Sequence, residues 1–248
     1  MPEIKQKFSQ LFSQYSYSEK EQLYEALTDF FSENKRQLLD QNIQNRTKHL
    51  TLVMEDIFQS QNASAVLRTA DCFGIQDVHI IENQYEYTLN PDVAMGSSKW
   101  VNYYRYNKKD QNNTVLAYND LRNKGYKIIA TLPHENDVML QDLDISQPIA
   151  LVFGTEKTGL SETAIKNADG FVKIPMYGFT ESFNISVSAA LCSFYLTEKI
   201  RNTEGLNWHL SPEEQIEQKL YWARQIVREA DKIMKKLAED MALPPLCL

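Results

Sequence analysis

Between residues 50 and 201 the chain alternates short, almost purely apolar runs with segments of helical periodicity. The apolar runs lie at residues 52–54, 78–81, 126–132, 149–153 and 171–174, and an alternating segment lies at 101–106. A strand that is apolar on both faces must be covered on both sides, and helices between strands make neighbouring strands parallel. The sequence therefore predicts an α/β fold, a mostly parallel sheet with helices on both faces.

Helical patterns flank this region at both ends. Three apolar stripes occupy the first fifty residues, the second of them after an expected N-cap at Ser18. Near the other end, Ser211, Pro212 and Glu214 form a capping-box pattern, and apolar residues then recur every three or four positions to Leu237. We expect one long docked helix there. The predicted domains are a helical extension at 1–48, an α/β domain at 49–203 and a C-terminal helical extension at 204–248.

Several classes of protein are excluded by what the sequence lacks. No apolar run approaches the roughly 18–20 residues of a membrane span, and the first ten residues carry no apolar signal core. The three cysteines are widely spaced, and the four histidines show no metal-ligand spacing. We therefore expect a cytoplasmic protein with reduced thiols, no metal site and no membrane contact.

The formal net charge of -7 argues against general nucleic-acid binding, but three segments are locally basic. They are residues 35–49, which include Arg46 and Lys48, residues 97–109, which include Lys99 and Arg105 among aromatic side chains, and residues 219–236. Each could be ordinary solvated surface. Because all three flank the polar loops that follow the predicted strands, where we expect the active site, we interpret them as candidate RNA-binding patches.

Three polar loops follow predicted strands, at residues 59–69, 154–161 and 175–184. The second approaches a phosphate-binding P-loop, but Leu160 stands where the lysine that contacts phosphate is required. No Gly-x-Gly-x-x-Gly motif follows a strand, and no loop contains histidine, so dinucleotide binding and Ser/His/Asp catalysis are disfavoured. The third loop leads into a helix at Ile185, an arrangement that binds ligands in open α/β sheets.

Together the three loops resemble the motifs of SpoU/TrmH-type RNA ribose 2′-O-methyltransferases of the SPOUT superfamily. The resembling stretches are Asn62–Thr69, Val152–Ser161 and Ile174–Ser188. Within that family the chain looks most like the branch that methylates guanosine-18 of tRNA. The resemblance implies a deep trefoil knot in the C-terminal part of the sheet, bound S-adenosylmethionine, a homodimer and a tRNA substrate.

The resemblance also implies roles for individual residues. Cofactor contacts fall on Thr131, Leu132, Gly154, Ile174, Met176 and Phe183, and catalytic roles fall on Arg68, Asn62, Glu156, Ser182 and Asn184. Arginine stays protonated in proteins, so our hypothesis is that Arg68 binds a phosphate and stabilises developing alkoxide charge. Alternatively, Asn62 and Asn184 are helix N-caps, Glu156 is a solvated loop acid and Arg68 is an exposed helix arginine.

Two other functions compete with tRNA methylation. A ribosomal RNA 2′-O-methyltransferase would carry the same motifs, although the short helical N-terminal extension favours tRNA. A knotted RNA-binding protein without activity is the second alternative, and the presence of Arg68, Glu156 and Asn184 argues against it.

Overall fold

The computed structural model describes residues 12–132, 138–155 and 158–246. These residues form two compact units. One is the α/β unit, residues 47–208, and the other combines the two flanks, up to Arg46 and from His209 onward. The flanks, which the sequence pattern suggested as two extensions, thus pack together as a single helical unit.

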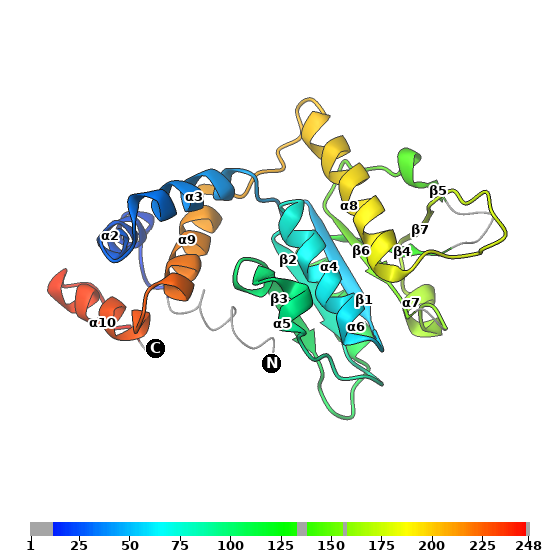
Figure 1. The fold of residues 1–248 in the computed structure, drawn as a ribbon, viewed down its shortest axis with the longest axis horizontal. Helices are drawn as coiled ribbons and strands as arrows, with labels where there is room; N and C mark the ends of the chain where they lie inside the picture. Colours follow the sequence, from blue (N-terminus) through cyan, green and yellow to red (C-terminus); the bar gives the residue numbers. More distant parts are fainter. Residues whose placement is uncertain (1–11, 133–137, 156–157, 247–248) are drawn as a thin grey trace. The chain divides into compact units, whose positions relative to one another are not determined.

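The α/β unit is built on a seven-stranded sheet in which every pairing is parallel (Figure 1). The strand order is β3-β2-β1-β6-β4-β7-β5. The strands are β1 (Leu50–Glu55), β2 (Asp77–Ile81), β3 (Asn102–Tyr106), β4 (Lys127–Thr131), β5 (Val138–Met139), β6 (Ile149–Phe153) and β7 (Gly170–Lys173). The predicted parallel α/β architecture is confirmed, whereas β5 is too short to leave an apolar run in the sequence.

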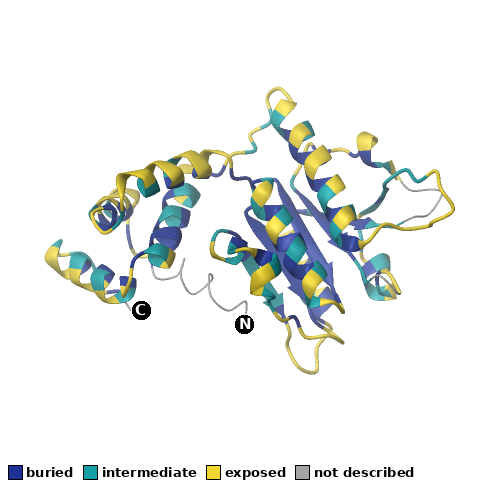
Figure 2. Cartoon of the chain, viewed as in Figure 1, coloured by how far each residue is buried: buried dark blue, intermediate teal, exposed yellow. Residues whose placement is uncertain are grey.

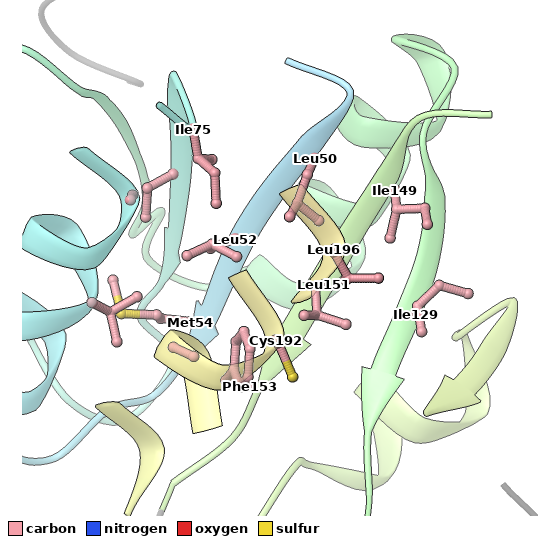
Figure 3. Packing of buried hydrophobic residues seen from close by; sticks show 14 of the residues in the cluster. Leu50, Leu52, Met54, Ile75, Ile129, Ile149, Leu151, Phe153, Cys192 and Leu196 are labelled. Atoms are coloured by element: carbon pink, nitrogen blue, oxygen red, sulfur yellow. The ribbon is translucent and has the colours of Figure 1, made fainter. Parts of the chain in front are cut away.

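Helices cover both faces of this sheet, as its apolar strands require. On one face α4 (Ser60–Cys72) and α8 (Ile185–Asn202) share a buried cluster with alternate residues of β1. On the other face α6 (Asn113–Asn123) and α7 (Glu162–Lys166) pack with Val53 and Val152. Figure 3 shows Leu50, Leu52 and Met54 of β1 in the first cluster with Cys192 and Leu196 of α8. The shorter elements are α5 (Pro91–Ala94), η1 (Ser97–Lys99) and η2 (Leu140–Asp142).

The flanking unit contains α2 (Tyr17–Thr28), α3 (Glu33–Gln44), α9 (Pro212–Ile226) and α10 (Ala230–Asp240). Each of these helices carries buried residues, and the remaining residues of its surface are half-buried or exposed (Figure 2). The predicted capping box at Ser211 is present, because its side chain accepts a hydrogen bond from the Glu214 N–H at 3.3 Å. Across the unit, the buried Lys20 forms ion pairs with Glu213 and Glu217.

Two local predictions in this unit are wrong. The second N-terminal helix is capped by Ser16, which forms its own capping box, and not by Ser18. The expected single C-terminal helix is two helices, because Glu229 adopts a left-handed conformation with φ of 55°. The apolar repeat continues across this break, so periodicity alone could not reveal it; Val227, Ala230 and Met234 remain buried.

None of the helices in the described part of the chain is long and apolar enough to cross a membrane.

A buried polar network joins β2, β3 and α6 near the β3 edge of the sheet. His79 is 1% exposed, its Nδ1 lies 2.9 Å from the Tyr106 hydroxyl, and that hydroxyl donates to Asp120 at 2.6 Å. The His79 ring also stacks on Tyr104. Burial, reinforced by the positive charge of Lys124, lowers the pKa of His79 to about 4.

This lowered pKa makes folding stability depend on pH. Unfolded histidine has a pKa of about 6.5, so between about pH 6.5 and pH 4 the unfolded chain binds a proton that folded His79 does not. The free energy of unfolding should therefore fall as the pH drops through this window, by on the order of 1–3 kcal/mol from this residue. We expect His79→Phe to reduce that slope in urea titrations between pH 4 and 7. An unchanged slope would show that His79 does not carry it.

Candidate functional site

A cavity of about 300 Å³ lies at the carboxyl ends of β4, β6 and β7. It lies where ligands bind in parallel α/β sheets, because the loops that follow adjacent strands converge there. The structure gathers seven of the predicted site residues around it: Thr131, Leu132, Gly154, Ile174, Met176, Ser182 and Phe183. These residues come from three separate loops, so the fold brings together what the sequence keeps apart.

Gly154 lines the cavity and packs closely against the backbone of Gly159. A Cβ atom at this position would lie 2.3 Å from the backbone carbon of Gly159. The approach is this close because Thr155 and Gly159 exchange two backbone hydrogen bonds of 3.0 Å each. Only glycine fits at residue 154 without moving the loop, which explains the motif's glycine in steric terms.

The cavity wall is mainly apolar with a few charged or polar groups. Leu132, Leu160 and Ile174 line it, and its described charged side chains are Lys173 and Glu181. Such a surface suits a flat aromatic group joined to a charged tail. Cys192 also lines the wall, but burial raises its pKa to about 12, so it remains a neutral thiol and is no nucleophile near neutral pH.

A buried carboxylate that the sequence analysis did not single out fixes the second loop. Glu55, at the end of β1, is 1% exposed and accepts hydrogen bonds from the Ser161 N–H at 2.9 Å and the Ser161 hydroxyl at 2.8 Å. The Thr114 hydroxyl of α6 donates to the same carboxylate. Glu55 thereby ties the end of the 154–161 loop to β1. The available sequence signal was an acid that directly follows a buried apolar strand.

Asn62 and Asn184 meet although 122 positions separate them. The Asn184 amide donates to the Asn62 side-chain oxygen at 3.4 Å, and Asn184 also caps α8 by accepting from the Ser186 N–H at 2.8 Å. Asn62 lies in the first turn of α4, and the residue in the N-cap position is Gln59. The capping alternative therefore holds for Asn184 but not for Asn62.

Arg68 lies on α4 with its side chain exposed, and it makes no hydrogen bond or ion pair within the described parts of the chain. Among the described residues, Arg68 therefore forms no hydrogen bond with Asn62 or Asn184. Ser182 is exposed at the rim of the cavity. The predicted residue Glu156 lies outside the described residues.

The four predicted RNA-binding residues have different environments. Lys99 is exposed on η1, and Lys48 is half-buried. The Arg105 guanidinium donates to the Glu82 carboxylate through Nε and one terminal nitrogen, with hydrogen bonds of 2.8 and 2.7 Å. Arg46 is 5% exposed and lies over the Trp222 ring, 5.3 Å from its centroid. Arg105 and Arg46 are thus engaged in folding contacts, which argues against their predicted RNA role.

Comparisons with known proteins point to one family. Residues 49–194 match the SpoU rRNA Methylase family. A tRNA (guanosine(18)-2′-O)-methyltransferase of Borreliella burgdorferi is 42% identical over 82% of this chain and 90% of the relative. The Thermus thermophilus enzyme of the same name is 33% identical over 66% of this chain and 81% of its own length.

Solved structures agree with this similarity. The crystal structure of the Aquifex aeolicus TrmH/SpoU tRNA modifying enzyme matches with a TM-score of 0.59 and 26% identity, over 86% of this chain and 98% of that one. The SpoU methyltransferase AviRb of Streptomyces viridochromogenes, solved with AdoMet, shares the fold at a TM-score of 0.55 and 21% identity, over 66% and 65% of the two chains.

The Glu55 contact can be tested with a matched pair of variants. Ser161→Ala and Thr114→Val each remove one hydroxyl that donates to Glu55, but only Ser161 belongs to the loop that lines the cavity. We expect both variants to lose stability. Only Ser161→Ala should weaken binding of S-adenosylmethionine, the cofactor that the family resemblance implies, by about three- to tenfold in calorimetry. Equal losses of affinity in the two variants would contradict a specific role for the loop anchor.

Proposed function

The chain belongs to the SpoU rRNA methylase family, and we propose that it methylates the ribose 2′-hydroxyl of guanosine-18 in tRNA, using S-adenosylmethionine. The observation that carries this proposal is the similarity over most of the chain to enzymes of that name. The motif residues of the chain support it, because those expected at the cofactor line one cavity. The chain is thus an S-adenosylmethionine-dependent RNA methyltransferase.

The residues around the cavity fit S-adenosylmethionine. The apolar wall suits an adenine ring, and Gly154 leaves room for the backbone of its loop to approach closely. Lys173 and Glu181 provide one charge of each sign for a tail that carries a carboxylate and an ammonium group. When bound, the cofactor supplies a methyl group on a sulfonium centre, which an oxygen nucleophile can accept.

The chain's own residues then have to position the ribose and exclude water. We assign ribose positioning to Ser182 and Asn184, with Asn62 holding Asn184 through their hydrogen bond. Arg68 binds the neighbouring phosphate and stabilises negative charge on the 2′-oxygen. Its exposed guanidinium, which has no partner among the described residues, is available for this. Glu156 is assigned to orienting Asn62 or the loop, on the family resemblance alone.

We also propose a homodimer, a deep trefoil knot and a cytoplasmic location. Support for the dimer comes from α8, where four apolar side chains are exposed: Val187, Leu191, Phe194 and Tyr195, at 44%, 41%, 57% and 38%. They recur with helical spacing and form an apolar stripe whose exposure to water is unfavourable.

Support for the knot comes from the strand order β6-β4-β7, in which two later strands flank an earlier one. The tRNA substrate and the free thiols of Cys72 and Cys192 support the location.

The proposed substrate can be tested directly with the purified protein. We expect S-adenosylmethionine and an unmodified tRNA transcript to yield 2′-O-methylguanosine at position 18, mapped by mass spectrometry of nuclease fragments. A transcript with 2′-deoxyguanosine at that position should accept no methyl group, since it lacks the nucleophilic oxygen. Methylation of ribosomal RNA fragments in place of tRNA would reassign the substrate.

The same assay tests Arg68. Arg68→Lys keeps the charge but loses the planar fork that binds a phosphate with two hydrogen bonds, so we expect kcat to fall by about tenfold or more with little change in cofactor affinity. Near-normal turnover in this variant would rule out the fork-dependent role.

The dimer can be tested with two valines of similar exposure. Val187 on α8 is 44% exposed, and Val115 on α6 is 37% exposed. We expect Val187→Glu to shift the protein to a monomer in sedimentation experiments, because it places a charge in an apolar contact. Val115→Glu should leave the assembly unchanged. A wild-type protein that sediments as a monomer would remove the basis for the dimer.

A further inference from the structure

Two large aromatic side chains are exposed together at the carboxyl edge of the sheet, apart from the residues that line the cavity. Phe58, in the loop after β1, is 60% exposed, and Tyr85, in the loop after β2, is 39% exposed. Their ring centroids are 5.1 Å apart, and the rings meet edge to face at 74°. Exposing two rings in one place costs free energy that burial would recover, so the pair calls for an explanation.

The backbone around this pair is held in place by a buried acid. Asp56 is 6% exposed, and its carboxylate accepts hydrogen bonds from the N–H groups of Asn83, Gln84 and Tyr85, at 2.7, 2.7 and 3.4 Å. Asp56 itself adopts a left-handed conformation with φ of 51°. Because Asp56 precedes Phe58 by two residues, one side chain links the two aromatic loops. The ring pair is therefore a preformed surface.

The pair is adjacent in the chain to the proposed reaction site. Phe58 directly precedes Gln59, the N-cap residue of α4, and the first turn of that helix contains Asn62. Asn62 contacts Asn184, which follows the cavity residues Ser182 and Phe183. An RNA strand with its ribose at Asn184 and the cofactor would thus have its neighbouring nucleotides near the start of α4.

The surroundings of the pair favour a small flat ligand over a protein partner. Its exposed chain neighbours Gln59, Gln84 and Glu86 are polar. Two rings within such a rim are much smaller than the roughly 800 Å² that each partner buries in a stable protein interface. A nucleobase matches their size, and aromatic side chains stack on unpaired bases of any sequence.

We infer that Phe58 and Tyr85 form a stacking platform for one unpaired base of the RNA substrate, a nucleotide flanking the one that is methylated. This inference rests on the proposed function and adds a binding subsite to it. The platform supplies affinity and register for the RNA and touches neither the cofactor nor the reacting oxygen.

Substitutions of Phe58 separate stacking from general apolar contact. Phe58→Leu keeps an apolar side chain without an aromatic face, whereas Phe58→Trp keeps a larger face. We expect Phe58→Leu to raise the Kd for an unmodified tRNA transcript by about fivefold or more, and Phe58→Trp to retain wild-type affinity. Affinity for S-adenosylmethionine in calorimetry and kcat at saturating tRNA should not change in either variant, which a misfolded loop would not allow.

Transcripts with one base removed then locate the contact. An abasic site at the stacked position should weaken wild-type binding as much as Phe58→Leu does. The two losses should not add when they are combined, because both remove the same contact. Full additivity at every nucleotide flanking guanosine-18 would overturn the platform.

Two further outcomes would count against the inference. Unchanged tRNA affinity in Phe58→Leu, with normal wild-type methylation, would overturn the platform and leave the proposed function intact. A shift of Phe58→Leu to a monomer in sedimentation would assign the pair to a subunit contact. Failure of the wild-type protein to bind or methylate tRNA would instead contradict the proposed function, on which the inference rests.

Discussion

The candidate site depends most on the hydrogen bonds that the buried Glu55 carboxylate accepts. Glu55 lies at the end of β1, an interior strand beside the central β6, and accepts hydrogen bonds from both the backbone and the side chain of Ser161. A buried charge is stable only when its hydrogen bonds are satisfied, so this carboxylate holds its donors firmly. Ser161 is thereby held at the end of the 154–161 loop, whose Gly154 and Leu160 line the cavity.

Short polar contacts of this kind recur along the carboxyl edge of the sheet. Asp56 fixes the loop after β2 as Glu55 fixes the loop after β6, and Asn184 links α8 to α4 through Asn62. The strands provide a rigid apolar frame, while these side chains set the positions of the loops. That division explains how loop segments can present preformed surfaces, as a methyl transfer requires.

The sequence predicted more of the frame than of the contacts. Apolar runs separated by helical patterns were sufficient to predict the parallel sheet, because a strand that is buried on both faces is apolar at nearly every position. Arg46 and Arg105 show the limit of that reasoning. Both lie in basic segments, but Arg105 pairs with Glu82 and Arg46 packs over Trp222. The partner of a charged side chain depends on long-range packing, so charge counted along the chain could not distinguish folding contacts from RNA contacts.

The sequence alone determined the fold class, the three loop motifs and, through their resemblance to a known family, the chemistry expected of them. Periodicity and motif spacing are local properties, so they can be recognised in the amino-acid sequence itself. Only the tertiary structure placed Thr131, Gly154 and Met176 around one cavity, joined Asn62 to Asn184 and paired Phe58 with Tyr85. The residues of each group come from different loops of the chain, and the order of strands in the sheet brings these loops together.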